Sequence, residues 1–404
     1  MTKPQRPLTL VLAYAALIIC VGMGIRHSFG LFLAPMSAAH GWSRELFSFA
    51  IALQNLLWGA AQPFVGLLAD RFGARRVLWA GSLLYLLGLI GMAWASSGSG
   101  FAASAGLLIG LALSGVTYSV VFSAMGPLLP AEKRSWAMGV VAAAGSFGQF
   151  LMVPLAAGLI SGIGWYATLI VFAALAATMA PLGTALTRGL VPAAATAGSQ
   201  NAGQAISEAA RDRGFLLLTL GYFVCGFQVV FISVHLPTYL LDKGLSANVG
   251  MTALALVGLF NIVGTYGAGY LGGHLPKRYL LATIYSLRSL IIALFLLLPL
   301  TPISVYLFAT SMGLLWLSTV PLTTAIVAQI FGVRFLGMLT GLVFFSHQIG
   351  SFLGVWLGGR LFDANGNYDA VWAICIGLGV VAALINLAVD ETSLASRQPA
   401  PSAA

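Results

Sequence analysis

The chain has 404 residues, of which 59% are hydrophobic and only 7% are charged. An ordinary soluble domain carries about 25% charged residues, so this composition excludes a water-soluble protein and predicts a polytopic protein of the lipid bilayer. The formal net charge of +9 does not indicate a nucleic-acid partner, because no compact basic domain carries it. The three cysteines lie in apolar runs without metal-ligand spacing, and we expect no metal or other cofactor.

Twelve apolar runs are long enough to cross a bilayer, which takes about 20 residues. They predict an all-α membrane protein with spans at 10–36, 44–68, 77–97, 101–128, 135–161, 165–187, 214–240, 247–272, 279–299, 302–326, 335–360 and 369–390. The first run is too long for the apolar region of a cleavable signal peptide, so we interpret it as the first span.

A polar segment divides the twelve spans into two groups of six. We predict an N-terminal six-helix bundle at 1–187, a cytoplasmic linker at 188–213, a C-terminal six-helix bundle at 214–390 and a disordered cytoplasmic tail at 391–404. The two groups show traces of a repeat, since Arg26 and Pro35 match Gln228 and Pro237 at an offset of 202 residues. Duplicated six-span units are common in secondary transporters.

Basic residues predict the orientation of the spans. With the N-terminus in the cytoplasm, fourteen of the 19 Lys and Arg residues fall in inside segments and three fall in outside loops. The remaining two, Arg26 and Arg288, lie within spans. The positive-inside rule therefore puts both termini in the cytoplasm of a multi-pass inner (plasma) membrane protein.

The loop after the second span reads GLLADRFGARR and begins at Gly66. It resembles the signature loop of the major facilitator superfamily, which implies two six-helix bundles and a conformational latch on the cytoplasmic side. Gly66 would allow close helix packing, and Gly73 a tight turn. The alternative is a solvated loop that only fixes topology. The matching loop of the second half has Gly273 in place of the acid. The latch positions are Gly66, Asp70, Arg71, Gly73, Arg75 and Arg76.

Charge in the middle of the spans is the most informative pattern. All ten acidic residues fall at span ends or in loops, whereas Arg26, His27, Arg288 and His347 lie near mid-span. A cation at that depth costs about 2.5–3.5 kcal/mol on insertion scales. An arginine without an acid needs another partner, and a small organic anion is the simplest one, because the planar guanidinium donates two parallel hydrogen bonds to a carboxylate.

The four mid-span residues differ in what the superfamily resemblance implies. Span one lines the central cavity of that fold, so Arg26 is the expected anion anchor. Span nine is peripheral, so Arg288 either contacts the substrate or only tethers a neighbouring helix. His27 and His347 are candidate proton carriers, with a structural histidine as the alternative for each. His235, late in span seven, is expected at the rim.

Polar residues at helical spacing predict the wall of a wet central cleft, although hydrogen bonding between helices explains any one of them equally well. The further substrate-binding candidates are Gln54, Asn55, Trp58, Tyr118, Ser119, Gln149, Gln228, Asn261, Thr265 and Gln348.

Two further stretches resemble bacterial members of the monocarboxylate porter family. They are RHSFGLF from Arg26 with GWSR from Gly41, and the basic pair and spaced glycines of 132–148. The resemblance implies a monocarboxylate substrate. Animal members carry a lysine where His27 stands, and an aspartate and an arginine where Asn261 and Thr265 stand. Proton coupling would therefore have to use histidine or the protonated substrate.

Other functions are weighed against this one. A drug or metabolite exporter of the same fold typically has an arginine in span four and a Gly-Pro pair in span five, and neither is present. No nucleophile–base pair or metal cluster indicates an enzyme. A non-transporting solute sensor stays open. We predict a monomeric secondary active transporter that moves a small organic anion by alternating access, with the coupling ion and direction left open.

Overall fold

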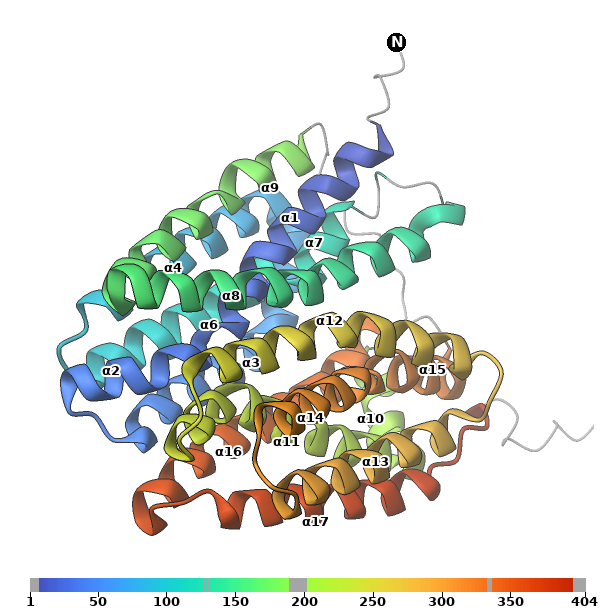
Figure 1. Ribbon diagram of the computed structural model, residues 1–404. Coiled ribbons are helices and arrows are strands. Elements are labelled where there is room, and N and C mark those ends of the chain that lie inside the picture. Colours follow the sequence, from blue (N-terminus) through green and yellow to red (C-terminus); the bar gives the residue numbers. More distant parts are fainter. Residues whose placement is uncertain (1–6, 126–127, 129–130, 189–201, 333–335, 395–404) are drawn as a thin grey trace, which may run out of the picture.

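The computed structural model describes residues 7–125, 128, 131–188, 202–332 and 336–394, and this part of the chain contains helices and no strands (Figure 1). The first half comprises α1 (Leu8–His27), η1 (Phe29–Phe32), α2 (Leu33–His40), α3 (Arg44–Phe72), α4 (Ala74–Trp94), α5 (Gly98–Phe101), η2 (Ala102–Leu108), α6 (Ile109–Val116), α7 (Tyr118–Met125), α8 (Ala131–Ala177) and α9 (Met179–Thr187). The second half comprises α10 (Ala202–Arg211), α11 (Arg213–Asp242), α12 (Ala247–Gly272), α13 (Lys277–Leu297), α14 (Pro302–Leu315), α15 (Thr319–Phe331), α16 (Leu336–Asn365) and α17 (Asp369–Leu387).

Ten helical segments of the described residues are long and apolar enough to cross a membrane. One of them, Ala137–Thr187, has 51 residues and contains Gly164, whose φ of 82° and ψ of 164° interrupt the helix. This break lies between the predicted fifth and sixth spans. The predicted second span corresponds to α3, which has 29 residues and is not among the ten. Its middle carries the polar residues Gln54, Asn55 and Gln62.

Two hydrophobic cores organise the helices. The first is built almost entirely from residues between Val11 and Leu186, and the second from residues between Ala209 and Val389. In Figure 1 the blue-to-green helices of the first half accordingly form one group and the yellow-to-red helices of the second half another. The halves meet where α3 packs on α16 and α8 packs on α12.

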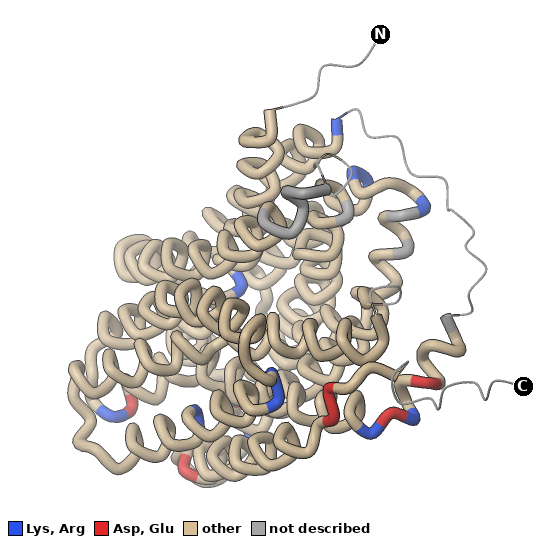
Figure 2. The backbone as a smooth tube through the Cα atoms, turned by 90° about the vertical axis from the view of Figure 1, so that its right-hand side faces the viewer, with Lys and Arg blue, Asp and Glu red and all other residues tan. Residues whose placement is uncertain are grey.

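We call the end at which α2, α11 and α16 finish the Arg44 end, and the opposite end, at which α1 begins, the N-terminal end. All ten acidic residues lie near helix ends or between helices, and most of the tube in Figure 2 is tan. This distribution is expected for helices whose middle parts face hydrocarbon.

The loop that resembles the latch lies at the N-terminal end. Gly73, with φ of 87°, separates α3 from α4, which confirms the predicted tight turn. An added Cβ at Gly66 meets no described atom within 4 Å, so the predicted close packing at Gly66 is wrong for this structure. Arg71 lies over the ring of Phe72 at 5.3 Å, and Arg75 and Arg76 are exposed. The side chain of Asp70 lies outside the described residues.

The predicted linker and tail are partly ordered. Residues 202–211 of the linker form α10, while residues 189–201 lie outside the described part. In the predicted disordered tail, the carboxylate of Glu391 accepts the backbone N–H of Arg278, and Leu394 packs against the second core. Disorder is therefore the wrong prediction for 391–394, because a charged side chain caps the start of α13. Residues 395–404 lie outside the description.

Candidate functional site

Arg26, near the end of α1, points at the interface between the halves. Its Nη2 donates to Oδ1 of Asn55 on α3 at 2.5 Å, and its guanidinium lies 4.8 Å from the ring centre of Trp58. Its Nε is buried and has no hydrogen-bond partner among the described residues. The two salt bridges of the described residues lie elsewhere, at the Arg44 end. The cation is therefore held by a neutral amide and an aromatic ring, and its buried Nε has no acceptor among the described residues.

A chain of rings connects this arginine to the second half. Trp58 contacts Phe344 of α16 with ring centres 5.3 Å apart, and Phe344 stacks on His347 at 5.8 Å. His347 in turn lies 5.0 Å from Tyr222 of α11. Such contacts make an apolar, polarisable wall next to a charged group.

The two histidines near mid-span each keep one unused nitrogen. His347 Nδ1 lies 3.1 Å from Oε1 of Gln348, and its buried Nε2 makes no hydrogen bond among the described residues, while the thiol of Cys225 interacts with the same ring. His27 is 8% exposed, and its Nδ1 is likewise buried without a described partner. Each ring therefore has one nitrogen that can accept or donate a further hydrogen bond.

Three of the predicted polar residues join the two halves. Gln348 Nε2 donates to the main-chain oxygen of Asn55 at 3.0 Å, and Gln149 Nε2 donates to that of Leu254 at 3.1 Å. On the α8–α12 side, Asn261 Nδ2 donates to Oγ of Ser146 at 2.9 Å. These contacts cross the interface on both of its sides, between α3 and α16 and between α8 and α12.

The contact between α3 and α16 is tight from Gly59 to the Arg44 end. An added Cβ would lie 2.6 Å from the side chain of Gln348 at Gly59, and 2.6 Å from the main-chain oxygen of Arg44 at Gly359. Toward the N-terminal end, an added Cβ meets no described atom within 4 Å at Gly66 on α3 or at Gly337 and Gly341 on α16. The close contact of α3 and α16 therefore covers one half of their length.

Several predicted cavity residues bond within their own half instead. Gln54 donates to the main-chain oxygen of Ala105 at 2.8 Å, Trp58 Nε1 to Oγ1 of Thr117 at 3.1 Å, and Gln62 to Oγ of Ser119 at 2.8 Å. These three side chains of α3 therefore bond to span four, as expected if they join neighbouring helices. In the second half, Gln228 is fully buried and donates to the main-chain oxygen of Cys375 at 2.8 Å. Tyr118 lies beside Phe122, and Thr265 donates to Asn261.

Arg288 of α13 is fully buried and serves a break between α14 and α15. Its Nε and Nη2 donate to the main-chain oxygen of Leu315 at 3.2 and 2.6 Å, and Nη2 also donates to that of Trp316 at 2.5 Å. Oδ1 of Asn261 accepts the N–H of Leu317 at 3.0 Å. These bonds satisfy backbone groups that the break releases, as a membrane interior requires. Arg288 therefore has the contacts of the tethering alternative.

Span four is broken in the corresponding place. Thr117, with φ of −102° and ψ of −167°, separates α6 from α7, and its side chain accepts the indole N–H of Trp58. Thr117 and Leu317 are 200 residues apart, close to the offset of the predicted repeat. Trp58 thus contacts both Arg26 and the break at Thr117, which corresponds to the break between α14 and α15 in the second half.

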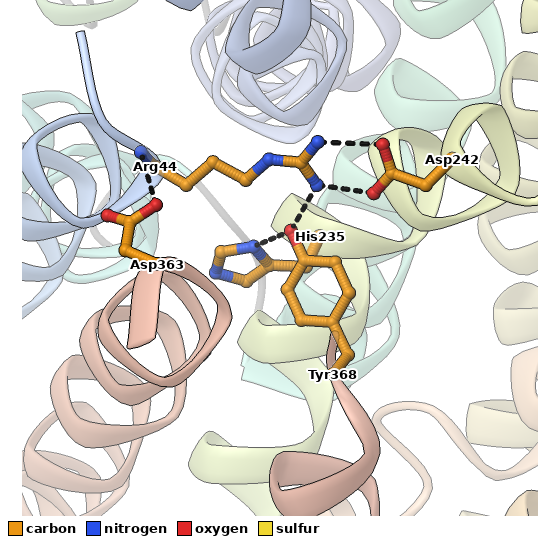
Figure 3. A network of polar contacts seen from close by, with 5 residues as sticks. All are labelled: Arg44, His235, Asp242, Asp363 and Tyr368. Atoms are coloured by element: carbon orange, nitrogen blue, oxygen red, sulfur yellow. Dashed lines mark hydrogen bonds and ion pairs between the residues drawn. The ribbon is translucent and has the colours of Figure 1, made fainter. Parts of the chain in front are cut away.

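The Arg44 end is closed by a network that the sequence analysis did not predict (Figure 3). Arg44 donates to both carboxylate oxygens of Asp242, at 2.5 and 2.7 Å, and to the hydroxyl of Tyr368 at 3.0 Å. Asp363 accepts the backbone N–H groups of Arg44 and Glu45 at 3.2 and 2.7 Å, and so caps α3 from the opposite half.

His235 lies beneath this network, 3.1 Å from the hydroxyl of Tyr368 and 2.9 Å from the main-chain oxygen of Val355. Burial raises the pKa of Tyr368 to about 12, so its hydroxyl keeps its proton at neutral pH and can donate to Nδ1 of His235. The opposite charges in the predicted outside loops were the available signal, but nothing in the sequence paired Arg44 with Asp242.

Comparisons with known proteins identify the family. The family model described as Major Facilitator Superfamily matches residues 12–322. The uncharacterized MFS-type transporter YcxA of Bacillus subtilis is 28% identical over 92% of this chain and 92% of its own length. Monocarboxylate transporter 13 of Bos taurus is 26% identical over 87% of this chain and 82% of its own. Monocarboxylate transporter 11 of Mus musculus is 27% identical over 91% and 83%.

Solved structures show the same fold. The crystal structure of a bacterial homologue of the human lysosomal transporter Spinster, in an inward-facing and occupied conformation, superposes with a TM-score of 0.76. The two chains are 16% identical, and each is covered completely. The chain thus belongs to the Major Facilitator Superfamily: it is a multi-pass membrane transporter that resembles the monocarboxylate transporters, and not an enzyme.

Proposed function

We propose that this protein is a secondary active transporter that moves a small monocarboxylate by alternating access, with Arg26 as the anion anchor. The observation that carries the proposal is the unpaired guanidinium of Arg26 at the interface between the halves, with one buried donor unused. A carboxylate would supply the charge and the second acceptor that Asn55 lacks. Relatives whose names describe monocarboxylate transporters support this substrate class.

The same proposal includes the full architecture. We propose twelve spans in two bundles, at 1–187 and 214–390. This number counts α3 as a span and divides the segment Ala137–Thr187 at Gly164 into two spans. Fourteen inside against three outside basic residues support cytoplasmic termini in the inner membrane, with the Arg44 end outside. In this orientation the network of Arg44 closes the outside, so the conformation is inward-facing. The loop from Gly66 to Arg76 would then act as the latch of the outward-facing state.

Within the site we assign further roles. Asn55, Trp58 and Gln348 complete the surroundings of Arg26, and the unused nitrogens of His27 and His347 support them as proton carriers. The transporter is proposed to work as a monomer. Symport with protons would need one of these histidines or a protonated substrate.

The test is counterflow of radiolabelled pyruvate, lactate and benzoate in proteoliposomes, because a sensor binds solute without moving it. Arg26→Ala should lower apparent affinity roughly 100-fold, since hydrogen bonds to charged groups contribute about 1.5–3 kcal/mol each. Arg26→Lys should recover part of the loss, because a point charge does not replace two parallel donors. Carboxylate counterflow at parental affinity in Arg26→Ala would contradict the anchor, and its absence across the panel in the parent protein would contradict the substrate class.

A further inference from the structure

Asn55 accepts the side-chain hydrogen bond of Arg26. It is 1% exposed, and its Nδ2 donates to the main-chain oxygen of Ile51 at 2.8 Å. This bond orients the amide so that Oδ1 faces Arg26 and accepts its Nη2 at 2.5 Å. Asn55 also accepts Gln348 from the other half through its main-chain oxygen at 3.0 Å. One residue thus holds the cation and joins the halves.

The bond between Arg26 and Asn55 uses one of the two donors on one edge of the guanidinium. Nε and Nη2 form one edge of the planar group, and a carboxylate engages both donors of such an edge with its two oxygens. The amide of Asn55 offers one oxygen, so Nε stays buried without a described partner. The oxygen of Asn55 therefore occupies one of the two positions that a bound carboxylate needs.

We propose that Asn55 is a neutral surrogate ligand, which holds Arg26 in the unloaded transporter and is displaced by the substrate carboxylate. This inference rests on the proposed function, because it takes Arg26 as the anchor. It adds a role for Asn55 as a positioning residue that competes with the substrate. Displacement would free the side chain of a residue whose main-chain oxygen accepts Gln348 of α16.

The surrogate role predicts the effect of an isosteric charge. Asn55→Asp places a carboxylate permanently on the edge of Arg26, and the purified variant without substrate should melt about 3 °C higher than the parent at pH 7.5, since the buried cation gains a partner. The gain requires the ionised carboxylate, so it should be present at neutral pH and should disappear in acid as the introduced side chain takes up a proton. A purely structural amide gives no such pH profile.

Asn386 provides the matched control. It is also 1% exposed, and its Nδ2 donates to the main-chain oxygen four residues earlier, that of Ala382, at 2.8 Å. No ion pair reaches it among the described residues. Asn386→Asp should therefore lower the melting temperature. Asn55→Asp combined with Arg26→Met should lower it as well, relative to Arg26→Met alone, because the introduced carboxylate then has no cation.

The outcomes separate this inference from the function it rests on. A melting temperature that falls in Asn55→Asp as far as in Asn386→Asp overturns the surrogate role, even if Arg26→Ala abolishes counterflow and the anchor stands. A rise that persists in the Arg26→Met background also overturns it. A rise that depends on Arg26, in a protein whose carboxylate transport does not, supports the geometry at Asn55 and contradicts the proposed substrate instead.

Discussion

Arg44 of α3 and Asp242 of α11 join the two halves through two parallel hydrogen bonds, at 2.5 and 2.7 Å. Their side chains are 18% and 33% exposed, so water screens the pair only in part. A partly exposed pair with this geometry is worth about 1 kcal/mol. Because the two residues belong to different halves, the pair contributes only while the Arg44 end is closed.

Asp242→Asn should therefore shift the transporter toward the state that is open at the Arg44 end. Ala52 reports this state, because it is fully buried on α3 between Ser48 and Asn55. A cysteine at Ala52 should react with a membrane-impermeant maleimide about 5-fold faster in the Asp242→Asn background, which corresponds to the loss of about 1 kcal/mol. The parent chain gives the background from the three native cysteines, which are buried.

Asp369→Asn serves as the control, since Asp369 is an exposed acid that begins α17 at the same end and makes no described ion pair with the first half. It should leave the labelling rate unchanged. Equal rates for the Asp242→Asn variant and the parent would show that the salt bridge does not bias the closed state.

The sequence predicted the helices well because their apolar runs have the length that a bilayer imposes. It also singled out Arg26, since a cation without an acid is conspicuous at mid-span, and Asn55 was one of ten polar residues predicted from their helical spacing. The helical spacing also predicted Gln54 as a cavity residue, but its amide donates to the main-chain oxygen of Ala105 in span four. Polar residues that face a cavity and polar residues that bond a neighbouring helix have identical spacing, and only the tertiary contacts distinguish them.

The Arg44 network could not be predicted for a related reason. Asp242 and Asp363 lie at the ends of different spans, and single charges in short loops carry no information about which loop they meet. Their partners follow from how the two halves meet at this end, where Arg44 of α3 reaches Asp242 of α11 and the backbone of α3 reaches Asp363 of α16. The approach of α3 to α16 depends on small residues at Gly59 and Gly359. Such close packing is set by the conformation of the whole protein, not by a local pattern.

Gly359→Ala tests whether that packing limits closure. The added Cβ would lie 2.6 Å from both the main-chain oxygen of Arg44 and Oγ of Ser48, and the backbone contact cannot yield without separating α16 from α3. We expect faster labelling of the Ala52→Cys reporter and slower transport, because the inward-facing state becomes strained. Gly341→Ala, on the same helix with no described atom within 4 Å, should change neither. Unaltered labelling in Gly359→Ala would mean that the helices accommodate the methyl group by local shifts.

Loss of Arg288 should lower the stability of the protein, whereas loss of Arg26 should lower its affinity for the substrate. Arg288 donates three bonds to the carbonyls of Leu315 and Trp316, and both carbonyls lose these donors in Arg288→Met. An unsatisfied buried polar group costs about 1–3 kcal/mol, and the relief of a buried charge offsets part of it. The variant should therefore melt several degrees lower while its affinity for a transported carboxylate stays within about 3-fold of the parent. Arg288→Lys should recover part of the stability, since an ammonium can still donate to both carbonyls. A loss of carboxylate affinity as large as that in Arg26→Ala, at unchanged melting temperature, would instead make Arg288 a second substrate contact.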